Sequence, residues 1–192
     1  MADVSVRPAR PADAERIARV QLSTWRTAYA DLLPAQALDV PEVQAAALWL
    51  GAIESPPTPT HRVMVAFERD ELVGFAASGP ASPAEVDAAE VDAAEVNPTE
   101  VDAVEVDAVE LLALLVEPRW GRRGHGSRLL AASVEDWRRD GRRPAVCWAF
   151  ELDPATRSFL TSAGFEAAGP TRGLDTGEQV RRQLLLHADL TS

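Results

Sequence analysis

Lysine is absent from this 192-residue chain, and cysteine and histidine are scarce. All 19 basic residues are arginines, so the chain cannot contain the Gly-Lys-Ser/Thr phosphate loop of nucleotide hydrolases. The single cysteine, Cys147, excludes a disulfide framework and favours a reducing compartment. One cysteine and three scattered histidines do not supply the ligands of a structural zinc site, so we expect no metal.

Long apolar runs are also missing. None approaches the roughly 18–20 residues of a membrane-spanning helix. The opening residues, MADVSVRPARPAD, lack the apolar core of a secretory signal. We therefore expect a cytoplasmic protein with no membrane partner. Apolar residues make up 46% of the chain, enough for a core, and the length suits a single domain over residues 1–192.

The formal net charge of −11 argues against nucleic acid as a partner. Ten of the 30 acidic residues fall within residues 85–110, a segment that contains no base. The other 20 acidic residues face 19 arginines, so the rest of the chain is nearly neutral. The acidity is therefore a property of one segment.

That acidic segment is a repeat of five residues. EVDAA, EVDAA, EVNPT, EVDAV and EVDAV follow one another in register over residues 85–109. Valines five residues apart step by about 140° around a helix and alternate between the faces of a strand, so neither element gains a buried face. We predict a flexible acidic loop over residues 80–109, inserted between the third and fourth strands. A short helix and a functional acidic arm are the alternatives.

Outside the repeat, the patterning predicts a mixed α/β sheet. Helices are expected over residues 13–29, 41–53, 126–139 and 153–163. Asp13 and Asp153 are expected to cap the first and the last of them. The second helix has an apolar stripe of Val43, Ala46, Ala47 and Leu50. Strands are expected over residues 4–7, in a hairpin within 62–78, and over 110–116, 145–150, 165–172 and 178–187.

The segment 111–137 carries the clearest chemical signal. A buried strand runs into a loop with Gly121, Gly124 and Gly126, after which a helix begins. Glycines let a ligand approach the backbone, and the free N–H groups at a helix N-terminus bind anions. Eight of the 19 arginines lie within residues 119–143. The pattern predicts a pocket for phosphate groups, and a tight turn with a solvated arginine face is the alternative.

Three stretches resemble segments of the GNAT superfamily of N-acetyltransferases. The family's acetyl-CoA motif, a V-x-P strand end followed by [QR]-x-x-G-x-[GA] and a helix, is similar to Val116-x-Pro118-x-Trp120-Gly121-Arg122-Arg123-Gly124-His125-Gly126-Ser127-x-Leu129-Leu130. Its later segment, N-x-x-A-x-x-[LF]-Y-x-x-x-G-F, is similar to Asp153-x-x-Thr156-x-x-Phe159-Leu160-x-x-x-Gly164-Phe165. The opening residues VRPARPADAERIARVQLSTWRTAY resemble the family's first strand and helix. The resemblance covers nearly the whole chain except residues 80–109.

The resemblance implies an α/β protein of the GNAT fold, with a mixed central sheet of about seven strands and four helices. It implies transfer of an acetyl group from acetyl-CoA to an amine, with no metal, and homodimers are common among such proteins. The acetyl group would lie where the strands 110–116 and 145–150 separate, and a backbone N–H near Val116 would stabilise the oxyanion. The residues implied in cofactor binding are Leu114, Leu115, Val116, Gly121, Arg122, Arg123, Gly124, His125, Gly126, Ser127 and Asp153.

The catalytic groups are less defined by the resemblance. Leu160 stands where many relatives carry the tyrosine that protonates the leaving thiolate. Tyr29, the only tyrosine, is a candidate for lining the site, with a packing role as the alternative. Glu110 is the first candidate for the general base and Glu151 the second. Hydroxyls that would assist the thiolate are Ser158, Thr161 and Ser162.

Other roles for the chain stay open at this point. The side chain of His125 is expected to face the cofactor or solvent rather than to act as a base. A non-catalytic CoA-binding sensor, or an interaction protein that uses the acidic arm, would be compatible with the missing tyrosine at position 160.

Overall fold

The computed structural model describes residues 3–82, 107–175 and 179–190. Most of the acidic repeat, residues 83–106, lies outside the described residues, so the flexible loop stays a prediction. The third and fourth strands pair as far as Pro80 and Val109, the two ends of the predicted loop. The connection between these strands therefore spans residues 81–108, one residue shorter at each end than expected.

Seven strands form one open sheet in the order β1-β2-β3-β4-β5-β7-β6. Every neighbouring pair is antiparallel except β4 and β5. The seven strands and the GNAT fold class are as predicted. The strands are β1 (Val4–Pro8), β2 (Arg62–Glu68), β3 (Glu71–Pro80), β4 (Val109–Val116), β5 (Ala145–Phe150), β6 (Glu166–Asp175) and β7 (Val180–Ala188).

The described part of the chain has five α-helices, one more than predicted. The addition is α2, a single turn that follows Pro34 and is too short to leave a periodic pattern. The helices are α1 (Ala14–Ala28), α2 (Ala35–Leu38), α3 (Glu42–Glu54), α5 (His125–Arg139) and α6 (Pro154–Ser162), with 3₁₀ turns η1 (Pro11–Asp13) and η2 (Pro118–Trp120). None of the described helices is long and apolar enough to cross a bilayer.

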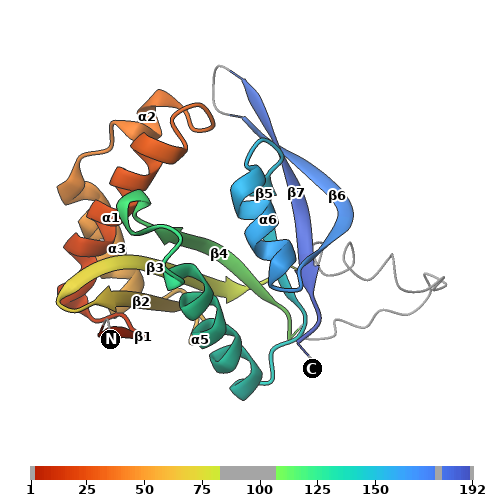
Figure 1. The fold of residues 1–192 in the computed structure, drawn as a ribbon, viewed down its shortest axis with the longest axis horizontal. Helices are drawn as coiled ribbons and strands as arrows, with labels where there is room; N and C mark the ends of the chain where they lie inside the picture. Colours follow the sequence, from red (N-terminus) through yellow and green to blue (C-terminus); the bar gives the residue numbers. More distant parts are fainter. Residues whose placement is uncertain (1–2, 83–106, 176–178, 191–192) are drawn as a thin grey trace.

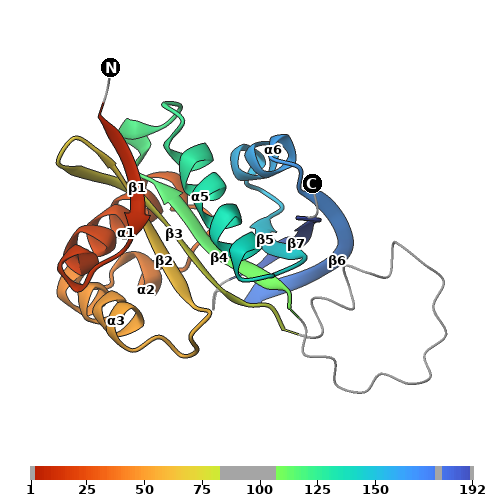
Figure 2. The ribbon, with the colours of Figure 1, turned by 90° about the horizontal axis from the view of Figure 1, so that it is seen from below.

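The helices lie on both faces of the sheet. Figure 2 shows α1 and α3 on one side, with α5 and α6 on the other. Ile17 and Val20 of α1 pack with Phe75 of β3 in one core cluster, and Leu129 and Leu130 of α5 lie in a second cluster on the opposite face. The sheet is therefore buried on both sides where it carries the site.

The parallel pair β4–β5 is short. Only Val109 with Ala145 and Glu110 with Val146 are paired, although both strands continue well beyond these residues. Figure 1 shows β4 and β5 diverging from this point. The separation of the two strands predicted at this position is thus present, and it leaves one edge of β4 without a strand partner.

A bulge in β4 shapes that open edge. Ala77 pairs with Ala113 while Ser78 pairs with Leu111, so Leu112 is an extra residue in β4. On one side of the bulge Leu111 packs in the cluster beneath α5, and on the other side Leu115 packs with α1. Leu112 itself is 51% exposed.

Two local expectations are wrong. Asp13 does not cap α1, because its carboxylate instead accepts hydrogen bonds from the Arg7 guanidinium (2.7 and 2.9 Å) and the Arg10 N–H (2.7 Å). Of the apolar stripe predicted for α3, only Ala46 is buried: Val43 is 77% exposed, and Ala47 and Leu50 are exposed as well. The helix packs instead through Ala45, Ala46, Trp49 and Ile53. This helix is apolar around most of its circumference, so periodicity could not select its buried face.

Candidate active site

A cleft of about 740 Å³ lies between the diverging strands. Its floor is the stretch Leu111–Val116 of β4, and its walls come from α1, β5, α6 and the loop before α5. The size is that of a site for a small molecule or cofactor. Among the residues predicted to bind cofactor, those that line the cleft are Leu114, Leu115, Val116, Gly121, Arg122, Gly124, His125, Gly126, Ser127 and Asp153.

The backbone of β4 presents hydrogen-bonding groups to this cleft. The N–H of Glu117 donates to the carbonyl of Val73 in β3 (2.9 Å), and the carbonyl of Leu115 lies against Gly74 of β3. Because alternate residues of a strand direct their backbone groups to opposite sides, Leu114 and Val116 direct theirs away from β3 and toward β5. An extended amide ligand can pair with them as an added strand would.

The loop before α5 ends in an anion-binding geometry. Arg122 and Gly124 both have positive φ (59° and 81°), which turns the chain sharply into the helix. Within the described residues, the N–H groups of residues 122–127 have no backbone or side-chain acceptor. The positive end of the helix dipole adds to their attraction for a negative group.

Arg122 is the arginine that this loop presents to a ligand. It lines the cleft, and no partner for its guanidinium is found in the described part of the chain. The neighbouring Arg119 pairs with Glu117 at 3.0 Å. Arg123 pairs with Glu68 at 3.3 Å and stacks over Trp120, with its guanidinium carbon 4.9 Å from the ring centroid. Of the cofactor residues predicted from the sequence, Arg123 is the one that does not line the cleft.

His125 holds the loop onto the sheet instead of facing a ligand or solvent. The residue is 1% exposed, and its Nε2 lies 2.9 Å from Oε2 of Glu68 at the end of β2. The Trp120 ring stands edge-on to the imidazole, with ring centroids 6.3 Å apart. The expected exposed side chain is therefore wrong, because burial beside a carboxylate fixes it. The backbone N–H of His125 still belongs to the anion-binding turn.

Tyr29 reaches the cleft from the end of α1. Its hydroxyl lies 3.3 Å from Oγ1 of Thr156 in α6, and Thr156 N–H donates to the capping carboxylate of Asp153 (3.0 Å). Burial raises the pKa of the Tyr29 hydroxyl to about 12, and the negative charge of Asp153 adds to the rise. The hydrogen bond with Thr156 acts in the opposite direction. Tyr29 therefore remains protonated at neutral pH.

Thr156 is the site residue that the sequence did not single out as a hydroxyl. It lines the cleft one helical turn before Leu160, so the two lie on the same face of α6. The hydroxyls proposed from the sequence differ from it: all three are exposed and do not line the cleft, namely Ser158, Thr161 and Ser162.

Neither glutamate lines the cleft. Glu110 is the last residue of β4 that pairs with β5. The next residue, Leu111, does line the cleft. Glu151 follows β5 and pairs with Arg182 at 3.5 Å, with 42% of its side chain exposed. The two carboxylates lie at opposite ends of the β4–β5 pair, because Glu151 comes five residues after the partner of Glu110, or about 17 Å along a strand.

Cys147 is buried on β5 and also lines the cleft. Burial raises the pKa of its thiol to about 12, with the negative charge of Glu110 adding to the rise and Arg172 opposing it. The thiol is therefore unreactive at neutral pH. Among the described residues, no group of three or more histidine, cysteine, aspartate or glutamate side chains is placed to hold a metal ion.

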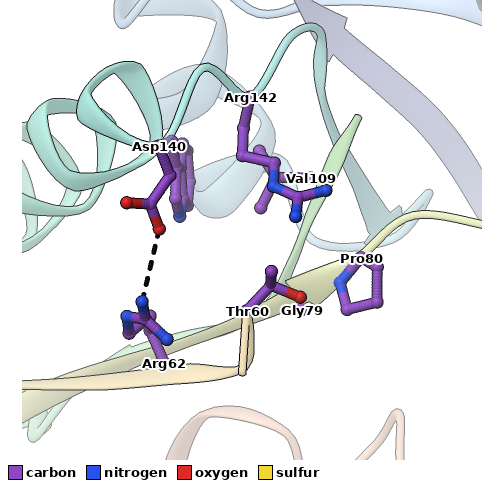
Figure 3. Close-up of a pocket in the computed structure, with 8 residues that line it drawn as sticks. Thr60, Arg62, Gly79, Pro80, Val109, Asp140 and Arg142 are labelled. Carbon is purple, nitrogen blue, oxygen red and sulfur yellow. Dashed lines mark hydrogen bonds and ion pairs between the residues drawn. The ribbon is translucent and has the colours of Figure 1, made fainter. Parts of the chain in front are cut away.

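A second pocket, of about 10 Å³, lies near the opposite end of α5 (Figure 3). Its wall includes the ion pair of Arg62 with Asp140, at 3.3 Å. This volume is at the lower limit for a single water molecule, so the pocket is no second cofactor site.

The comparison with family models identifies the class of protein that this fold and cleft define. The model described as the acetyltransferase (GNAT) family matches residues 23–165. The chain therefore belongs to the GNAT acetyltransferase family, whose members are acetyl-CoA-dependent acyltransferases. No curated protein sequence matches the chain at a significant level.

Solved structures share the fold over nearly the whole chain. The PaiA N-acetyltransferase of Thermoplasma acidophilum, in complex with coenzyme A, is 15% identical, with 97% of this chain and 99% of that one covered and a TM-score of 0.69. YncA of Salmonella typhimurium, a putative acetyltransferase with acetyl-CoA, is 17% identical (98% and 95%, TM-score 0.67). The ribosomal-protein-alanine N-acetyltransferase of Brucella melitensis is 17% identical (96% and 99%, TM-score 0.70). At these identities the likeness concerns the fold.

Proposed function

We propose that this protein transfers the acetyl group of acetyl-CoA to a primary amine, with both substrates bound together. The observation that carries the proposal is the cleft between β4 and β5, which joins an anion-binding turn to an open strand edge. Two proteins of the same fold were solved with coenzyme A or acetyl-CoA, which supports the choice of cofactor. The reducing compartment favoured by a single cysteine supports a cytoplasmic location, and a homodimer stays a prediction.

The chain's own groups would hold the cofactor in two places. The N–H groups of residues 122–127 and the Arg122 guanidinium bind its diphosphate, because they are unpaired donors around a helix N-terminus. The backbone groups of Leu114 and Val116 pair with the pantetheine amides. The thioester then lies in the gap beyond Glu110, where a backbone N–H on the open edge of β4 would be available to the oxyanion.

Direct attack by the amine is favoured over an acetyl-enzyme. The neutral amine attacks the thioester carbonyl, a tetrahedral intermediate forms, the C–S bond breaks, CoA leaves as a thiolate and the nitrogen releases one proton to solvent. Cys147 is the only thiol of the chain, and its raised pKa makes it a poor nucleophile for the two-step route.

The attacking amine must first lose a proton. An alkyl ammonium with a pKa near 10.4 costs roughly 4.6 kcal/mol to deprotonate at pH 7. We assign this proton to Glu110 through a water molecule, because Glu110 stands at the point where β4 and β5 separate. Glu151, paired with Arg182, is the weaker candidate.

Tyr29 compensates for the leucine at position 160. Its hydroxyl lies 3.3 Å from the Thr156 hydroxyl of α6, one helical turn from Leu160. It therefore lies beside the wall of the cleft to which Leu160 belongs. A thiol has a pKa of about 8.5, so complete proton transfer from a tyrosine of pKa about 12 would cost roughly 5 kcal/mol. Tyr29 therefore stabilises the leaving thiolate by donating a hydrogen bond rather than its proton.

A non-catalytic CoA-binding protein is the second candidate, and the position of the two glutamates outside the cleft lining is the observation that favours it.

Release of CoA thiol at saturating acetyl-CoA with a panel of amines separates the acetyltransferase from the non-catalytic binding protein. Amine-dependent turnover that falls at least tenfold in Glu110→Gln but not in Glu151→Gln supports the proposal. Tight cofactor binding without turnover on any amine contradicts it. Deletion of residues 84–106, which keeps the buried Ala108 and the β4 residue Val109, followed by the same assay and by partner capture, tests the acidic arm.

A further inference from the structure

The cleft has two halves of different chemistry. The half next to α5 carries the anion-binding turn and the charged side chains of Arg122 and Asp153. The other half is lined by residues of α1, a helix that lies on the opposite side of the sheet from α5 (Figure 2). If the cofactor occupies the α5 half, as proposed above, the acceptor amine approaches from the α1 half.

The α1 half is built from aromatic and aliphatic side chains. Trp25 and Tyr29 come from α1 and its end, and Trp148 and Phe150 come from β5. The rings of Tyr29 and Phe150 contact each other, with centroids 6.3 Å apart. Leu33 completes this wall. Four aromatic rings around one opening provide a large apolar surface for the body of a ligand.

The amide side chains in this half have their oxygens engaged within the protein. The oxygen of Gln21 accepts the indole N–H of Trp49 (2.7 Å), and that of Gln183 accepts the Arg172 Nε–H (2.8 Å). Among the described residues that line the whole cleft, Asp153 is the one acidic side chain, and its carboxylate already accepts the Thr156 N–H (3.0 Å). A second or third ammonium group, or a ring of hydroxyls, would lose water there with at most one carboxylate, already hydrogen-bonded, as an ionic partner.

Two leucines in the cleft are left partly uncovered. Leu112, the bulge residue of β4, is 51% exposed, and Leu174 of β6 is 39% exposed. Apolar side chains exposed inside a cleft mark a surface that a ligand covers. Burying them against an apolar ligand is favourable in proportion to the area removed from water.

We propose that the acceptor is a monoamine carried on an aromatic or aliphatic body, and that Leu112, Leu174 and the aromatic rings select it. Polyamines and amino sugars, which need carboxylates or many polar partners, are excluded by the same surface. This inference rests on the proposed acetyl transfer and adds the substrate class.

The test compares 2-phenylethylamine with ethanolamine and spermidine. We expect kcat/KM for 2-phenylethylamine to exceed that of each of the other two by about tenfold or more, since apolar contacts in a pocket discriminate on this scale. Leu174→Ala should lower kcat/KM for 2-phenylethylamine several-fold, mainly through KM, and leave ethanolamine unchanged. Leu152→Ala is the matched control, because Leu152 is 64% exposed and does not line the cleft.

Equal or better use of ethanolamine or spermidine overturns the inference, as does an equal effect of Leu174→Ala and Leu152→Ala. Calorimetric binding of each amine to the CoA-loaded protein keeps this result separate from the proposed function. If no amine is acetylated, the proposed function fails, and the order of the amine dissociation constants still decides whether the cleft prefers an apolar monoamine.

Discussion

Removal of the Arg122 guanidinium tests the anion-binding turn. Arg122 lines the cleft and has no partner among the described residues, so its charge is available to a diphosphate. A charge-assisted hydrogen bond contributes about 1.5–3 kcal/mol, which is roughly 10- to 150-fold in the dissociation constant. Alanine is preferred to glycine as the replacement, because φ is 59° at this position and alanine keeps the backbone strain that arginine has there. Glycine would also change the strain of the turn.

The assay is calorimetric titration with acetyl-CoA and, in parallel, with S-acetylpantetheine, which lacks the diphosphate. Arg122→Ala should weaken acetyl-CoA binding by the stated factor and leave S-acetylpantetheine unchanged. Arg119→Ala is the control, since Arg119 pairs with Glu117 and does not line the cleft. Equal losses in the two variants, or an equal loss with both ligands, would refute the assignment of Arg122 to the diphosphate.

Three further predictions follow from named contacts. Tyr29→Phe should lower kcat by about tenfold with little change in the KM for acetyl-CoA, as expected for one lost hydrogen bond to the thiolate. The wild-type rate should show no alkaline loss below pH 11 from ionisation of Tyr29, whose pKa is about 12. Asp13→Asn should lower the free energy of unfolding by about 1–3 kcal/mol at pH 7 in urea titrations. Burial acts to raise the pKa of the Asp13 carboxyl, but the hydrogen bonds from Arg7 and Arg10 hold it below its usual value. That stabilisation is complete above the pKa of the carboxyl in the unfolded chain, about 3.9, and is lost as the pH falls through the lower pKa of the folded protein. If the difference in unfolding free energy between wild type and Asp13→Asn stays the same below that pH, the role assigned to Asp13 is wrong. Gly74→Ala should destabilise the protein by about 1–3 kcal/mol, because the new Cβ would lie 2.7 Å from the Leu115 carbonyl oxygen in β4. Gly51→Ala in α3, where nothing lies within 4 Å, should instead stabilise by about 0.5–1 kcal/mol; similar effects of the two substitutions would show that steric crowding is not the cause.

The elements that position the cofactor could be predicted from the sequence because local rules determine them. A continuous apolar run indicated β4, and the glycine-rich loop with free N–H groups indicated the start of α5. The Asp153 cap of α6 followed from its position before a proline, and its carboxylate does accept the Thr156 N–H.

What could not be predicted depends on contacts between distant segments. Glu68 lies 57 residues before His125, and only the fold shows that the two side chains pair. Tyr29 and Thr156 are 127 residues apart, and the sequence placed no hydroxyl at that meeting point. The bulge at Leu112 arises from the pairing register with β3, which the composition of β4 does not encode.

A crystal structure with acetyl-CoA bound is the most direct measurement. It should place the diphosphate against the N–H groups of residues 122–127, the pantetheine along Leu114–Val116 and the thioester in the gap between β4 and β5. The acetyl group should face the aromatic half of the cleft. A diphosphate bound away from the loop before α5, or a thioester outside the gap, would contradict the account.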